Sequence, residues 1–215
     1  MWASTMKIFY IDTSSNYLIT GIVENNKLIG SVVEKLGENL SRDAVPLVAK
    51  MFDKAEVNPK DIDKIIVVDG PGSFTGIRIG ITIAKVYAYA FNINITSISS
   101  LEAMKESFND ASYFVPIIDA RRGYVYSAIY DKDGKEYLPK QYIKLSLLKD
   151  NLKKIKDYLI ITNDDIDIEG IKVKYKPDIL KIVEKYKNRK NINPHSVNPN
   201  YLKLTEAEEK LMDNK

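Results

Sequence analysis

The sequence predicts an α/β protein of two lobes, each a mixed sheet with flanking helices. The first observation is a duplication: a strand ending in an acid, a tight polar turn and a returning strand occur at 7–23 and again at 114–130. The second is a buried strand that runs into a glycine-rich turn and then a long helix at 70–91. Because duplicated units build related halves of a protein, we expect the two acids, Asp12 and Asp119, to line a cleft between the lobes.

The first lobe is predicted to comprise residues 1–102. Alternating apolar residues and polar turns predict strands at 7–12, 17–23 and 28–34. A helix follows to residue 55, capped by Ser41 or Asp43, and Pro46 is tolerated in its first turn. A strand at 65–69, the long helix and a strand at 93–98 complete this lobe.

The second, smaller lobe is predicted to comprise residues 103–215. A helix at 101–108 leads into it, and strands are expected at 114–119, at 124–130, from 135 and at 158–162. The pattern then predicts a helix at 177–186, a loop at 191–200 and a charged tail. Each lobe therefore has its own sheet.

The long helix carries a ridge of small residues. Gly76, Gly80, Ala84 and Ala88 recur every four positions, so they lie above one another on one helical face. The remaining faces are mostly apolar, which is typical of a helix buried on more than one side. Two interpretations are open: the ridge packs against the protein's own sheet, or it receives a partner helix.

Composition excludes several kinds of site. With 45% hydrophobic and 28% charged residues among 215, the chain is typical of a soluble protein. It has no cysteine, which excludes disulfides, thiolate zinc sites and cysteine nucleophiles. Its single histidine, His195, lies in a polar loop without neighbouring ligands, so no metal site is expected. No signal peptide or transmembrane segment is recognised, so we expect a cytoplasmic protein that does not bind membranes.

The net charge of +3 is only mildly basic. Lysines crowd residues 140–190, but aspartates and glutamates are mixed among them. This mixture favours a solvated charged face. A nucleic-acid surface is the open alternative, because phosphate contacts need lysines but no motif.

The glycine-rich turn does not fit the common nucleotide or hydrolase loops. No lysine follows its glycines as a P-loop requires, and Gly70, Gly72 and Gly76 are spaced one residue too far apart for a dinucleotide fingerprint. Ser73 stands one position too early for a nucleophile elbow.

The run Gly-Pro-Gly-Ser-Phe-Thr-Gly-Ile-Arg-Ile-Gly at 70–80 resembles the signature of the TsaB (YeaZ) family. Shorter likenesses at 11–14, 100–102, 118–122 and 199–203 occur in the family's order. The duplicated strand, acid and turn resemble the actin-like ATPase superfamily, with its ribonuclease H-like fold. The resemblance implies that fold here.

The resemblance also implies a function in tRNA modification. In that pathway a TsaC-type enzyme makes threonylcarbamoyl-AMP, and TsaD transfers the threonylcarbamoyl group to the adenosine 3′ of the tRNA anticodon, helped by TsaB and the ATPase TsaE. The chain would be a noncatalytic accessory subunit. Its expected partners are a TsaD-type subunit and a TsaE-type ATPase, with a homodimer when alone, and tRNA reached only through the complex.

The resemblance implies that the partner binds the helices of the first lobe, through the ridge of small residues and the exposed side of the helix at 44–55. The expected partner-binding residues are Val48, Met51, Phe52, Gly76, Gly80, Ile83, Ala84, Tyr87 and Ala88. TsaD holds a metal through a His-x-x-x-His pair, and the corresponding segment here, 39–45, contains no histidine. The resemblance therefore implies no metal site.

Two alternatives use the cleft differently. An ATPase or kinase would bind nucleotide through Asp12, Thr13, Ser14 and Asp119, but the turn at 12–15 lacks the glycine that lets backbone N–H groups close on phosphate. We therefore expect no required cofactor and at most weak ATP or ADP binding. A glycoprotease-like peptidase is less favoured, since one histidine and no cysteine leave only carboxylates as metal ligands.

Overall fold

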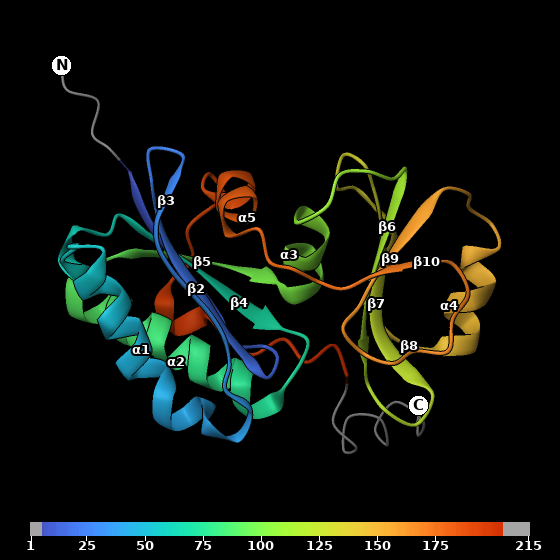
Figure 1. The fold of residues 1–215 in the computed structure, drawn as a ribbon, viewed down its shortest axis with the longest axis horizontal. Coiled ribbons are helices and arrows are strands. Elements are labelled where there is room, and N and C mark those ends of the chain that lie inside the picture. The colour runs from blue at the N-terminus through green and yellow to red at the C-terminus, as the bar shows by residue number, and fades with distance from the viewer. Residues whose placement is uncertain (1–5, 204–215) are drawn as a thin grey trace.

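The computed structural model describes residues 6–203, and they form two lobes side by side (Figure 1). The first lobe contains a five-stranded sheet in the order β3-β2-β1-β4-β5. Strand β1 pairs antiparallel with β2 and parallel with β4, so the sheet is mixed. Its strands are β1 (Lys7–Asp12), β2 (Tyr17–Glu24), β3 (Lys27–Lys35), β4 (Lys64–Gly70) and β5 (Asn94–Ser99).

The second lobe repeats this arrangement in the order β10-β9-β6-β7-β8. Strand β6 pairs antiparallel with β7 and parallel with β9, as β1 does with β2 and β4. The predicted duplication and the two-lobed α/β fold class are therefore confirmed. The strands are β6 (Tyr113–Asp119), β7 (Tyr124–Asp131), β8 (Glu136–Lys144), β9 (Tyr158–Ile161) and β10 (Ile171–Val173).

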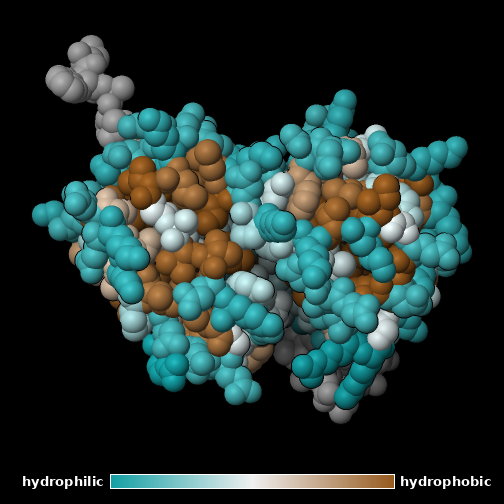
Figure 2. Space-filling view, in the orientation of Figure 1, coloured by the Kyte–Doolittle hydropathy of each residue, from teal (hydrophilic) through white to brown (hydrophobic). Residues whose placement is uncertain are grey.

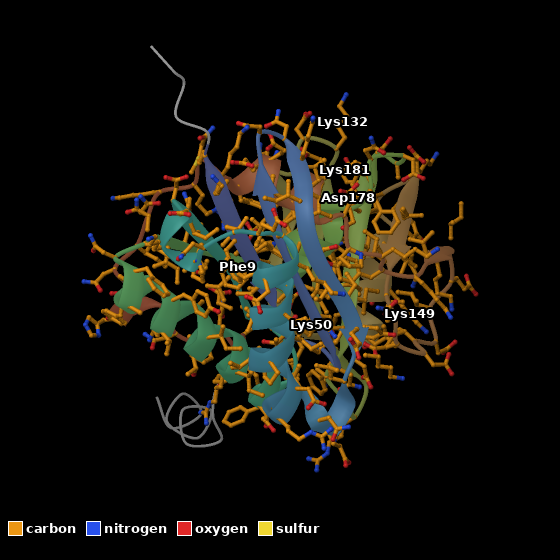
Figure 3. The ribbon with its side chains drawn as sticks, turned by 60° about the vertical axis from the view of Figure 1, so that its left-hand side comes forward. Phe9, Lys50, Lys132, Lys149, Asp178 and Lys181 are labelled. Atoms are coloured by element: carbon orange, nitrogen blue, oxygen red, sulfur yellow. The ribbon has the colours of Figure 1, made fainter. Side chains whose placement is uncertain are left out.

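Helices cover both faces of the first sheet. On one face lie α1 (Leu40–Lys54) and α2 (Phe74–Phe91), whose apolar residues share a core with β1 and β4. Phe9 on β1 is labelled in Figure 3. Its ring centre lies 5.2 Å from that of Phe52 of α1 and 5.5 Å from that of Tyr87 of α2. On the other face, α5 (Ile179–Tyr186) packs with Ala103 of α3 (Ser100–Glu106).

The remaining helices belong to the second lobe and to the connections. Helix α4 (Leu145–Leu152) covers one face of the second sheet through Leu148 and Leu152. Short 3-10 helices occur at η1 (Gly37–Asn39), η2 (Pro59–Asp61) and η3 (Pro194–Ser196). Within 6–203, no helix combines the length and apolar character needed to span a membrane.

The predicted domain boundary needs a correction. Residues 103–215 do not form one lobe, because the chain returns to the first lobe after β10: Ile182 and Val183 of α5 share a core with Ile8 and Tyr10 of β1. Further on, the backbone N–H of Ile192 donates to the carbonyl oxygen of Ile95 at 2.9 Å. The first lobe is thus built from both ends of the described chain, and the charged tail lies outside the described residues.

One α-helix and one strand were not predicted from the sequence. Helix α4 is only eight residues long, and strand β10 only three. Both are stabilised mainly by contacts with the second sheet, so they leave little periodicity in the sequence.

Candidate functional site

The turn between β1 and β2 is hydrogen-bonded to the N-terminal end of α2. The hydroxyl of Thr13 donates to the carbonyl oxygen of Gly76 at 2.7 Å, and the backbone N–H of Ser73 donates to the carbonyl oxygen of Ser14, also at 2.7 Å. Ser73 also caps the helix, because its Oγ accepts the N–H of Gly76 at 3.2 Å. The turn and the helix are therefore joined backbone to backbone.

This close contact between the turn and α2 explains the glycine-rich motif. A Cβ atom added at Gly76 would lie 2.1 Å from the carbonyl oxygen of Thr13, and one at Gly72 would lie 2.1 Å from that of Ser14. At Gly80 it would lie 2.3 Å from the Thr13 hydroxyl. Distances this short exclude any side chain, so the glycines are required by the close approach of the turn.

The ridge of small residues is consequently not an open surface, and the expectation that it receives a partner helix needs a correction. Gly76, Gly80, Ala84 and Ala88 are all buried, and the ridge packs within its own lobe. Four other predicted partner-binding residues, Val48, Met51, Phe52 and Ile83, are also buried in that core. Tyr87 alone of the nine is partly exposed, with its ring 5.6 Å from that of Phe52.

The exposed sides of the same two helices carry different residues. On α1, Val45 is 55% exposed, and on α2, Val86 is 57% exposed. Ala49 and Thr82 are exposed as well, and Ile79 is partly exposed. We call these five residues the outer helix face. The four-residue spacing could have indicated it, since these positions lie away from the buried ridge.

A cleft of about 1010 Å³ separates the lobes. In the space-filling view, mostly hydrophilic residues lie along the line where the lobes meet (Figure 2). Of the candidate nucleotide-binding residues, Asp12, Ser14 and Asp119 line the cleft, together with Arg121. Thr13 does not line it, because it is buried under α2.

The carboxylate of Asp12 is committed to its own turn. It accepts the N–H of Ser14 at 2.8 Å, and burial raises the pKa of its carboxyl group above the ordinary value. The carbonyl oxygen of Thr13 faces Gly76 of α2, and that of Ser14 faces Gly72 in the turn before this helix. The turn thus directs carbonyl oxygens at the glycine-rich segment, and the backbone N–H of Ser14 is already bonded to Asp12. A phosphate-binding loop instead directs free backbone N–H groups at the ligand.

Asp119 occupies the equivalent place in the second lobe but is exposed. Its backbone N–H donates to Asp164 Oδ2 at 2.7 Å, and its Oδ1 accepts the N–H of Arg121 at 2.9 Å. The two cleft acids therefore have different surroundings, one buried and one open to solvent.

A charged network joins the two lobes. Glu102 of α3 pairs with Arg189 at 2.6 Å and with Lys140 of β8 at 3.5 Å. Burial, and to a smaller extent the charge of Glu102, raise the pKa of the nearby Asp69 to about 6. One oxygen of Asp69, Oδ1, is buried and accepts no hydrogen bond within the described part of the chain.

His195 lies apart from the cleft. It is exposed on η3, with its ring 4.7 Å from that of Tyr89 at the far end of α2. Within residues 6–203, no group of three or more histidine, cysteine, aspartate or glutamate side chains is arranged to hold a metal ion.

Known proteins share both the sequence and the fold of this chain. A family model described as TsaD, tRNA N6-adenosine threonylcarbamoyltransferase, matches residues 14–208. The tRNA threonylcarbamoyladenosine biosynthesis protein TsaB of Bacillus subtilis is 32% identical, in an alignment covering 97% of this chain and 99% of the relative. The chain belongs to the TsaB family. The TsaB protein of Buchnera aphidicola is 27% identical, over 87% of this chain and 91% of its own.

A solved structure supports the fold. YeaZ from Pseudomonas aeruginosa superposes with a TM-score of 0.74 at 20% identity, covering 92% of this chain and all of its own. This agreement extends over both lobes, so the actin-like fold implied by the sequence is confirmed.

Proposed function

We propose that the chain is a noncatalytic subunit that supports a TsaD-type transferase in forming threonylcarbamoyladenosine on tRNA. The relatives named as TsaB proteins of this pathway span nearly the whole chain, and the family model is that of the transferase itself. The observation that carries the proposal is the outer helix face, an apolar surface on the two helices next to the glycine-rich motif.

The outer helix face has the chemistry of a helix-packing interface. Val45, Val86 and Ile79 offer branched side chains, while Ala49 and Thr82 are small enough for another helix to approach closely. Burying each large apolar side chain contributes about 1.5–3 kcal/mol, so a few on each partner can stabilise a complex. A related subunit with the same fold would offer equivalent helices, and a homodimer of this chain would use the same face in competition.

A noncatalytic function agrees with the first-lobe turn. Its carbonyl oxygens face Gly72 and Gly76 of the glycine-rich segment and its acid accepts the N–H of Ser14, so an incoming phosphate would find few free N–H groups. No cofactor is therefore required in this proposal, and ATP or ADP binding at Asp12, Ser14 and Asp119 is weak. An ATPase or kinase mechanism and a peptidase mechanism are both less favoured by this arrangement.

The other partners follow from the pathway. A TsaE-type ATPase would join the complex of the chain and the transferase, and the proteins would act in the cytoplasm. The catalytic groups for threonylcarbamoyl transfer would come from the TsaD-type subunit.

Co-purification tests the proposal directly. A tagged form of the chain is mixed with a TsaD-type subunit, and the complex is measured by size-exclusion chromatography with light scattering. We expect a heterodimer that forms at the expense of any homodimer. Failure to associate under conditions where both proteins are folded would contradict the proposal.

A further inference from the structure

Three tyrosines gather on the second lobe, away from the outer helix face. The rings of Tyr124 on β7 and Tyr142 on β8 stack with centroids 4.6 Å apart and planes inclined by 6°. The ring of Tyr126, which lines the cleft, lies 5.6 Å from that of Tyr142. All three are only partly buried. Part of each residue is therefore exposed to solvent.

The register of β7 and β8 brings these rings together. Tyr126 pairs with Tyr142, and Tyr124 pairs with Lys144. Because paired residues point to the same face of a sheet, the tyrosines and the lysine share one face. Strand β8 is at the edge of its sheet, so this face continues to the border of the lobe.

Basic side chains surround the rings. The Nζ atom of Lys144 lies 6.0 Å from the centre of the Tyr124 ring, and that of Lys203 lies 5.4 Å from the centre of the Tyr142 ring. The turn between β6 and β7 adds Arg121 and Arg122, both exposed. We call the six residues the tyrosine surface: Arg121, Arg122, Tyr124, Tyr142, Lys144 and Lys203.

The positive charge of this surface is largely uncompensated. Among residues 6–203, no carboxylate forms an ion pair with Arg121, Arg122 or Lys144. Other lysines of the second lobe do have acidic partners, as Lys153 does with Asp150. Asp119 lies on the cleft side of the turn, where it accepts the backbone N–H of Arg121 at 2.9 Å. The basic side chains therefore remain available to an anionic ligand.

We propose that the tyrosine surface binds an unpaired stretch of RNA. Flat aromatic rings stack on exposed bases, and the flanking lysines and arginines neutralise the phosphates between them. Double-stranded RNA offers phosphates but no open base faces, so it would contact only the basic side chains and not stack on the rings. The inference rests on the proposed function, because the tRNA substrate of that function has unpaired loops. It differs from the expectation that tRNA is reached only through the complex, since the chain would contact the RNA directly.

The test uses fluorescence anisotropy with two labelled probes, an unstructured RNA oligonucleotide and a duplex RNA of the same length. The full chain is titrated alone and in complex with a TsaD-type subunit. Tyr124→Leu and Tyr142→Leu remove the stacking rings, while Tyr137→Leu is the matched control, 48% exposed and on β8 like Tyr142. Lys144→Gln reduces the charge, and Lys154→Gln is its control beyond α4.

We expect the chain to prefer the single-stranded probe, and each tyrosine variant to weaken that binding about 5- to 100-fold. Lys144→Gln should also lower the slope of log affinity against log salt by about 0.7. The two control variants should bind as the native chain does. Equal binding by native chain and tyrosine variants, or equal affinity for duplex, would overturn the proposal.

Variants are checked by thermal unfolding, and the lysine variant keeps the test valid if a tyrosine variant does not fold. If the tyrosine variants lose protein association and keep RNA binding, the surface is a protein interface and the inference is wrong. If the heterodimer forms but native and variant chains bind RNA equally, the inference fails while the proposed function stands. RNA binding that depends on the tyrosines, without formation of any heterodimer, would support the inference and contradict the proposed function.

Discussion

The hydroxyl of Thr13 donates to the carbonyl oxygen of Gly76 at 2.7 Å, and this bond joins the first turn of the chain to a helix 63 residues later. Such a contact is within reach only because Gly76 has no side chain. The glycine-rich motif therefore serves the internal packing of the first lobe. Because the motif fixes the position of α2 on its own sheet, the outer helix face points away from the lobe.

Gly76→Ala should destabilise the protein by about 3 kcal/mol, because its Cβ would overlap the carbonyl oxygen of Thr13 and the backbone would have to shift. Urea unfolding followed by circular dichroism measures the change. Gly37→Asn is the control, since Gly37 has open space around it and asparagine tolerates its φ of 55°. Equal stability of the Gly76→Ala variant and the native chain would contradict the requirement for glycine at this contact.

Val86→Arg should prevent association with the TsaD-type subunit while leaving the fold intact, because it places a long charged side chain on the outer helix face. Leu147→Arg is the matched control: Leu147 is 52% exposed but lies on α4 of the second lobe. Binding is measured by isothermal titration. If both variants bind normally, the partner uses another surface.

Asp69→Asn should change how stability depends on pH. Burial raises the pKa of Asp69 to about 6 from 3.8, so the folded state binds this proton more tightly than the unfolded state. Ionisation of Asp69 therefore lowers the free energy of unfolding as pH rises from about 4 to about 6, by at most about 3 kcal/mol. The variant, unfolded by urea at pH 4 and pH 8, should lose that decrease. A parallel pH dependence in both proteins would contradict this assignment.

Asp12→Asn should leave association and tRNA modification unchanged, because an amide oxygen can still accept the N–H of Ser14. The variant also tests the nucleotide hypothesis. ATP binding to the native chain and the variant is compared by equilibrium dialysis. Tight binding that the substitution abolishes, with loss of modification, would instead favour a nucleotide-dependent mechanism.

Much of the fold could be predicted because its strands are strongly patterned. The predicted strand at 7–12 coincides with β1. The repeat at 114–130 is recognisable because Asp12 and Asp119 each end a strand and precede a turn, and β6 and β7 occur there. The return of α5 to the first lobe could not be predicted. Its amphipathic pattern shows that Ile182 and Val183 are buried, but not which of the two sheets they cover.

The candidate site was only partly predictable, for a similar reason. The spacing of Gly76, Gly80, Ala84 and Ala88 indicated a close backbone approach, and that approach exists. Which backbone approaches depends on the distant turn at Thr13, which periodicity within α2 does not encode. The exposed residues Val45 and Val86 then had to be identified from the packing.

The most direct test of the central claim is nucleoside mass spectrometry of tRNA incubated with TsaC-type, TsaD-type and TsaE-type proteins, threonine, bicarbonate and ATP. The reaction is run with the chain, without it, and with the chain alone. We predict that threonylcarbamoyladenosine appears only when the chain and the transferase are both present. Equal yields with and without the chain, or product from the chain alone, would contradict a noncatalytic supporting function.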